Sequence, residues 1–121
     1  MKHQALSLRP FIGAKDFELS RQFYRDLGFE EHILSTKMSV FKTGALSFYL
    51  QDYYVKDWID NTMLFLEVAD VTYYWNQLLV LDLTTKYAGV KLTPIQTYDW
   101  GSECFLHDPS GVLWHFGAFT K

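Results

Sequence analysis

The same order of strand and helix patterns occurs twice along this chain of 121 residues, and this repeat constrains the fold more than any other feature. In each half, a short apolar segment precedes an aspartate, Asp16 or Asp70, whose side chain can cap the first turn of a helix. The two aspartates mark the same point of each half, and three strand patterns follow each helix pattern. We therefore predict the order β-α-β-β-β in both halves.

In the first half, the alternation of Leu6, Leu8 and Ile12 predicts a strand, and Pro10 places it at an edge or a bulge. Apolar residues then recur at helical spacing from Leu19, and Gly28 ends that helix. The three strands that follow are predicted at 29–34, 38–42 and 45–50.

The second half repeats this plan with different residues. A strand is predicted at 63–68, and a helix follows whose apolar face runs from Val71 to Leu81. Three further strands are predicted at 90–94, 103–106 and 112–116, the last two joined by the turn Asp108–Gly111. Because neither half can bury its sheet face alone, we expect one α+β domain over residues 1–121. Module one spans about 4–51, the linker about 52–61 and module two about 62–119.

Charge and cysteine content exclude several classes of protein. A net charge of −3 and a pI near 5.7 argue against nucleic-acid binding, which needs a basic surface. The single Cys104 excludes an internal disulfide and a cysteine-rich zinc site. No targeting segment or membrane span is recognisable, so we expect a cytoplasmic protein.

Aromatic residues form 18% of the chain, which is more than a two-layer core of this size needs. Rings also line pockets that bind flat ligands. The surplus therefore indicates a small-molecule site.

Four segments resemble the vicinal oxygen chelate superfamily, the glyoxalase, bleomycin-resistance and dioxygenase group. They are GAKDFELSRQFYRDLGF, SFYLQ, FLEVADV and WGSECFLHDPSGVLWHF, and Trp100-Gly101 looks most like the bleomycin-resistance branch. The resemblance covers essentially the whole chain. It implies two paired βαβββ modules that form a curved mixed sheet enclosing a cavity.

Enzymes of this superfamily bind a divalent metal in that cavity. The resemblance places the four ligand positions at Arg9, Tyr49, Met63 and His115. Only His115 is a good ligand, because arginine stays protonated and methionine prefers soft metals. We therefore expect no metal and no other cofactor.

The last two predicted strands suggest a second pair of reactive residues. If their loop has four residues, Cys104 lies opposite His115, and both side chains face the cavity together with Leu106, while Phe105 and Trp114 face the core. The two residues are then either a nucleophile pair or, as we favour, a small buried cysteine beside a hydrogen-bonded histidine. Glu103 is either an edge residue or a carboxylate directed at a cationic ligand.

The linker carries three rings among three acidic residues, and it is either a solvated connection or a lip of the cavity that stacks on a ligand. The resemblance favours a metal-free binding protein of the bleomycin-resistance type, a homodimer that sequesters a partly aromatic or cationic molecule. In this hypothesis no residue is catalytic, and the ligand-binding residues are Arg9, Tyr49, Tyr54, Trp58, Trp100, Cys104 and His115. The alternative is a glyoxalase-like or dioxygenase-like enzyme, a lyase or isomerase with an altered metal centre.

Overall fold

The computed structural model describes all 121 residues, and it contains the predicted repeat. The elements of the first module are β1 (Phe11–Gly13), α1 (Phe17–Asp26), β2 (Glu30–Ser35), β3 (Met38–Thr43) and β4 (Leu46–Gln51). Those of the second are β5 (Met63–Glu67), α3 (Val71–Leu81), α4 (Leu83–Lys86), β6 (Lys91–Tyr98), β7 (Gly101–His107) and β8 (Leu113–Phe119). A short helix, α2 (Lys56–Asp60), lies between the modules, within the segment predicted as a linker.

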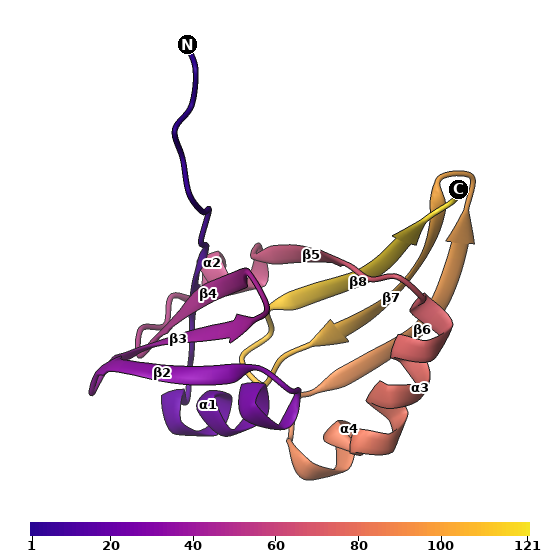
Figure 1. Cartoon of the computed structure of the whole chain (residues 1–121). Coiled ribbons are helices and arrows are strands. Elements are labelled where there is room, and N and C mark those ends of the chain that lie inside the picture. Colours follow the sequence, from indigo (N-terminus) through magenta and orange to yellow (C-terminus); the bar gives the residue numbers. More distant parts are fainter.

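Each module forms a four-stranded mixed sheet. The strand orders are β1-β4-β3-β2 and β5-β8-β7-β6, with the first strand of each module parallel to the last. The helices α1, α3 and α4 lie on one side of the sheets, and the opposite side, here called the open face, carries no helix layer of its own (Figure 1). The α+β architecture of two modules with curved mixed sheets is confirmed.

The core lies between the sheets and the helices, and aromatic rings fill much of it. Tyr24 of α1 is fully buried, and its ring lies 5.0 Å from Phe48 and 5.9 Å from Trp114, measured between ring centroids. Burying one such side chain stabilises the fold by about 1.5–3 kcal/mol. Because Phe48 belongs to the first module and Trp114 to the second, this cluster joins the modules into one unit.

Both predicted helix starts are confirmed. The Oδ1 atom of Asp16 accepts a hydrogen bond from the Leu19 amide at 3.1 Å, and that of Asp70 accepts one from the Tyr73 amide at 3.0 Å. Gly28 follows the end of α1 with a positive φ, a backbone conformation that favours glycine.

The predicted first strand is wrong over most of its length. Only residues 11–13 form β1, whereas residues 1–10, here called the N-terminal arm, have no regular structure and project from the body (Figure 1). The Tyr49 amide still donates to the Pro10 carbonyl at 2.9 Å, but proline has no amide hydrogen to continue the ladder. Leu6 and Leu8, 100% and 95% exposed, therefore pair with no strand.

None of the helices is long and apolar enough to span a membrane.

Candidate functional site

The pairing of β7 with β8 differs by one residue from the prediction, and this difference reverses the faces of the β7 side chains. His107 pairs with Leu113, so the loop has five residues, and Cys104 lies opposite Phe116, not opposite His115. A slip of one residue turns every side chain of a strand to the other face. Cys104 and Leu106 consequently lie in the core, whereas Phe105 shares the open face with His115.

Cys104 is fully buried, and burial raises the pKa of its thiol to about 11. The thiolate is the reactive form of cysteine, so this residue is inert at neutral pH. Both the nucleophile pair and the assignment of Cys104 to the ligand site are therefore wrong. The predicted position of Trp114 in the core is confirmed.

Glu103 takes the place beside His115 that the prediction gave to Cys104. Its Oε1 atom lies 2.5 Å from Nδ1 of His115, and only 9% of the glutamate side chain is exposed. Strand β7 lies between β6 and β8, so the interpretation of Glu103 as an edge residue is also wrong. The open face of the second module thus contains a half-buried carboxylate–imidazole pair.

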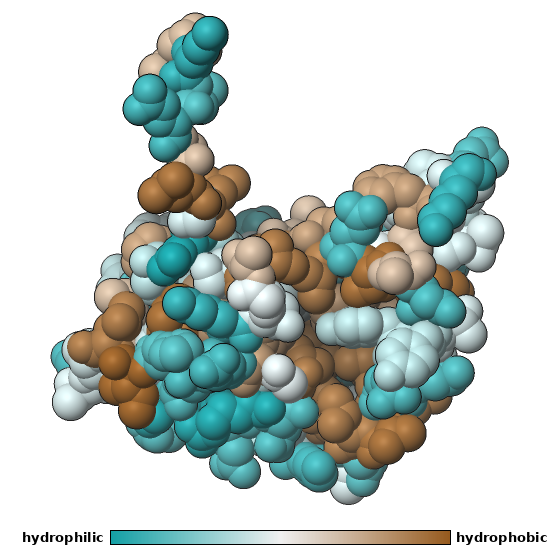
Figure 2. Space-filling model, in the orientation of Figure 1, coloured by the Kyte–Doolittle hydropathy of each residue, from teal (hydrophilic) through white to brown (hydrophobic).

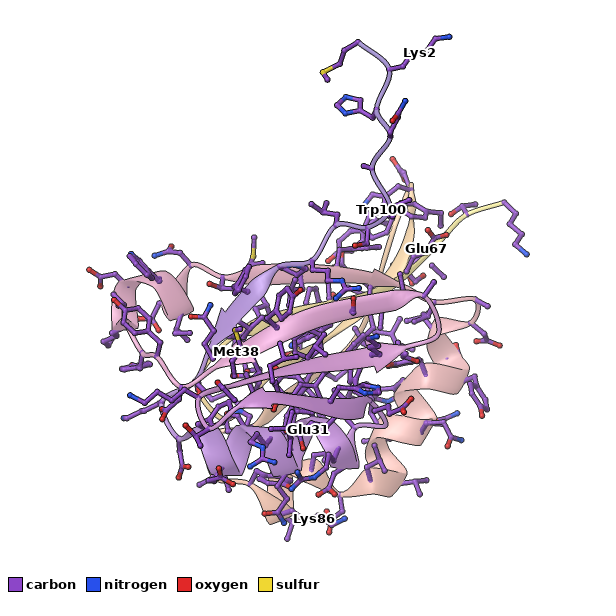
Figure 3. The ribbon with its side chains drawn as sticks, turned by 60° about the vertical axis from the view of Figure 1, so that its left-hand side comes forward. Lys2, Glu31, Met38, Glu67, Lys86 and Trp100 are labelled. Carbon is purple, nitrogen blue, oxygen red and sulfur yellow. The ribbon has the colours of Figure 1, made fainter.

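A cluster of partly exposed rings lies next to this pair. Phe65 of β5 lies 6.3 Å from the His115 ring and 6.1 Å from Trp100, and Trp100 stacks on Tyr98 at 5.3 Å and lies 5.6 Å from Phe119. We call Phe65, Tyr98, Trp100 and Phe119 the aromatic cluster. Figure 2 shows apolar surface between the N-terminal arm and the tip of the β6–β7 hairpin. In Figure 3, Trp100 and Glu67 lie on the side away from Glu31 and Lys86.

Two glycines make room for the aromatic cluster. A Cβ atom on Gly117 would lie 2.5 Å from Cζ of Phe65, so the ring can lie over β8 only because this residue has no side chain. At Gly101, a Cβ atom would collide with the Ala118 carbonyl oxygen, so glycine lets β7 start directly beside the end of β8. Trp100 is placed by this close approach.

On the first module, the structure brings Arg9 and Tyr49 together. The Arg9 guanidinium donates to the Tyr49 hydroxyl at 3.3 Å and lies over the same ring, which stacks on Phe11 at 4.6 Å. Trp58 is 63% exposed and lines a small groove with Phe11. Tyr54 lies apart from that groove, with its ring 5.8 Å from the Lys15 ammonium.

These residues do not fit a divalent metal. His115 has one nitrogen held by Glu103, an arrangement that metal-binding histidines share, but the other three family positions offer no second strong ligand. Arg9 bonds to Tyr49 as a cation, and Met63 offers a thioether. No group of three or more His, Cys, Asp and Glu side chains is arranged to hold an ion.

Sequence reasoning missed Glu103 as the partner of His115 and missed Phe65 altogether. Phe65 alternates with Leu64 and Leu66 in an apolar strand, so its pattern does not distinguish the open face from the core. For Glu103, the signal was a carboxylate inside an otherwise apolar strand, but its meaning depended on the strand register.

Comparison with solved structures shows which proteins share this fold. A bleomycin-binding protein complexed with bleomycin superposes with a TM-score of 0.78 at 18% identity, over 94% of this chain and 98% of that chain. The bleomycin-binding protein of Streptomyces verticillus has a TM-score of 0.74 at 22% identity, over 98% of this chain and 100% of the other. The chain has the vicinal oxygen chelate fold.

The lactoylglutathione lyase of Agrobacterium tumefaciens shares the fold as well, with a TM-score of 0.72 at 14% identity over 96% of both chains. At these identities the vicinal oxygen chelate neighbours establish the architecture and not the activity. No family model matches the sequence, and no curated protein matches it significantly.

Proposed function

We propose that this chain is a metal-free binding protein of the bleomycin-resistance type that sequesters a small, partly aromatic or cationic molecule. The observation that carries the proposal is the aromatic cluster on the open face, where Phe65 and Trp100 are 46% and 39% exposed beside a polar pair. Exposed rings next to a few polar groups are typical of small-molecule sites, because rings bind flat surfaces and polar groups orient them.

Six of the seven residues named from the sequence are kept as proposed ligand contacts, but they lie in separate places. At the aromatic cluster, Trp100 stacks on the ligand and His115 forms a hydrogen bond with it. On the first module and the linker, Arg9 and Tyr49 offer polar groups, and Trp58 and Tyr54 offer exposed rings. Cys104 is left out because it is buried in the core. The free thiol of Cys104 is compatible with a reducing compartment, and we place the protein in the cytoplasm.

The solved structures support this function by analogy. Two of the neighbours are described as bleomycin-binding proteins, and others as fosfomycin resistance proteins. The ligand of this chain is accordingly proposed to be an antibiotic-like natural product, bound without turnover.

We also propose a homodimer. An apolar slot of about 400 Å³ lies at the base of the N-terminal arm, between Leu46 and Phe48 of β4 and Leu64 of β5. None of its lining residues is charged, and Ser7 and Ser47 are the only ones with a polar side chain. Leu6 and Leu8 border this slot, and a second copy of the chain would cover both.

A ligand screen followed by a Trp100→Ala variant tests the binding function. Thermal-shift assays with antibiotics and flat aromatic compounds identify ligands, since binding at 100 times Kd stabilises by about 2.7 kcal/mol. Titrating each ligand against intrinsic fluorescence should show at least a tenfold weaker affinity in Trp100→Ala. Tyr73→Ala, which removes an exposed ring on α3, is the control and should bind normally. An unchanged affinity in Trp100→Ala would remove this residue from the site.

Metal analysis and the fate of the ligand distinguish the alternative, an enzyme, from the proposed binding protein. Protein purified without chelators should contain less than stoichiometric zinc, nickel, iron or manganese, because Arg9, Tyr49 and Met63 occupy the ligand positions. Stoichiometric metal, or consumption of a ligand by the wild-type protein, would favour a lyase, isomerase or dioxygenase.

A further inference from the structure

In the pair formed by Glu103 and His115, the donor and the acceptor of the hydrogen bond can be assigned. An ionised carboxylate only accepts hydrogen bonds, so the 2.5 Å contact needs a proton on Nδ1 of His115. A neutral imidazole with hydrogen on Nδ1 has an unprotonated Nε2. In the neutral form of His115, Glu103 therefore makes the second nitrogen an acceptor.

That nitrogen belongs to a side chain that borders open space. His115 lines a pocket of about 290 Å³ together with Met63, Leu64 and Phe65. Its side chain is 22% exposed, whereas that of Glu103 is 9% exposed, so a ligand reaches the imidazole and not the carboxylate. The pair thus presents one accepting atom to the pocket.

The surroundings of the imidazole are aromatic. The Phe105 ring lies edge-on to it at 5.0 Å, and the Phe65 ring, exposed toward the pocket, lies 6.3 Å away at an interplanar angle of 31°. A flat ring that lies on Phe65 brings a substituent at its edge to His115. A hydroxyl group at the edge of such a ring would supply the donor that Nε2 needs.

We propose that His115, held by Glu103, accepts the proton of a phenolic hydroxyl, and that the ligands of this face are phenols. This inference deepens the proposed binding function and rests on it. The O–H bond of the phenol breaks, its electron pair stays on oxygen as the phenolate, and the proton forms an N–H bond at Nε2. The resulting imidazolium lies between the phenolate and the Glu103 carboxylate, so both its N–H groups are paired, and the pocket contains no net new charge.

The test uses two probes that differ only in the donor, 4-nitrophenol and its methyl ether 4-nitroanisole. Phenol and phenolate forms of the first have different absorption spectra, so one titration reports both binding and proton transfer. At a pH where the free probe is mostly the phenol, wild-type protein should increase the phenolate absorbance and bind 4-nitrophenol at least tenfold more tightly than 4-nitroanisole.

Three variants locate the acceptor. His115→Gln should abolish the phenolate signal and the tenfold preference for 4-nitrophenol over 4-nitroanisole. Glu103→Gln, which keeps the shape but not the charge, should reduce the phenolate signal strongly. His32→Gln, on the half-exposed histidine of β2, is the control and should behave as wild type.

Histidine ¹⁵N NMR spectra of the ligand-free wild-type protein give an independent readout, with the hydrogen of His115 expected on Nδ1. A hydrogen on Nε2, equal affinity for the two probes, or a phenolate signal that survives His115→Gln would overturn the phenol inference. Equal binding of both probes would leave the binding function standing, whereas failure of wild type to bind either would count against the aromatic binding site itself.

Discussion

A single carboxylate, that of Asp108, determines which residues of the last two strands reach the open face. Its Oδ1 atom accepts hydrogen bonds from the amides of Ser110, Gly111 and Val112 at 2.8–2.9 Å. These bonds close a loop of five residues between β7 and β8, and the loop sets the strand register. The other oxygen, Oδ2, accepts a hydrogen bond from the Tyr24 hydroxyl at 2.6 Å, and this hydroxyl accepts one from Nε1 of Trp114 at 2.9 Å.

Replacing Tyr24 by phenylalanine tests how much this buried network stabilises the protein. The variant leaves an Asp108 oxygen and the Trp114 N–H without partners in the core, and such buried orphan groups cost about 1–3 kcal/mol. Urea unfolding should show that loss in Tyr24→Phe. The control is Tyr73→Phe, on an exposed ring of α3. It should change the free energy of unfolding by no more than about 0.5 kcal/mol. Equal effects of the two variants would show that the network adds no stability.

At the scale of elements, α1 is attached to its sheet by an ion-pair network centred on Glu31 of β2. Glu31 accepts hydrogen bonds from Nε of Arg21 at 2.6 Å, from Arg25 at 2.7 Å and from the Ser39 hydroxyl at 2.7 Å. Burial by itself would raise the pKa of Glu31, but these donors lower it from 4.5 to about 2. The network therefore makes the docking of α1 depend on an ionised carboxylate.

We expect this network to be lost in acid. The unfolded chain takes up the proton near the ordinary pKa, so the stabilisation is complete above about 4.5 and disappears as the pH falls toward about 2. Urea unfolding across that range should show that the difference in the free energy of unfolding between wild type and Glu31→Gln becomes smaller as the pH falls. Glu67→Gln, on an exposed residue of β5, should give no such pH-dependent difference. A difference that stays constant down to the lower end of the range would contradict the assignment.

At the scale of the whole molecule, the segments that project from the body lie on the side opposite the helices. The N-terminal arm and the tip of the β6–β7 hairpin both project away from the helices (Figure 1). The arm carries two exposed leucines, and the slot at its base is apolar. A single chain leaves this surface in contact with water, which is unfavourable for apolar groups and favours a partner.

Light scattering should give a particle with twice the mass of one chain for the wild-type protein, since twofold pairing is the commonest assembly. Deleting residues 1–9 should shift the equilibrium toward a single chain, because it removes both exposed leucines. The substitutions Leu6→Ser and Leu8→Ser together should have the same effect, and Lys2→Ser with Gln4→Ser, in the same arm, should leave the dimer intact. A wild-type protein that scatters as one chain at tens of micromolar would be evidence against the dimer.

The sequence by itself determined the features that depend on neighbouring residues. The two caps, Asp16 and Asp70, and the repeated order of elements follow from side chains within one or two turns of each other. Only the tertiary structure decided the rest. Local sequence patterns do not give the length of the loop between β7 and β8. That length depends on hydrogen bonds to the Asp108 carboxylate, which Tyr24 of the first module holds in place. The loop of five residues placed Glu103, and not Cys104, beside His115, because a shift of one residue in register exchanges the two faces of a strand.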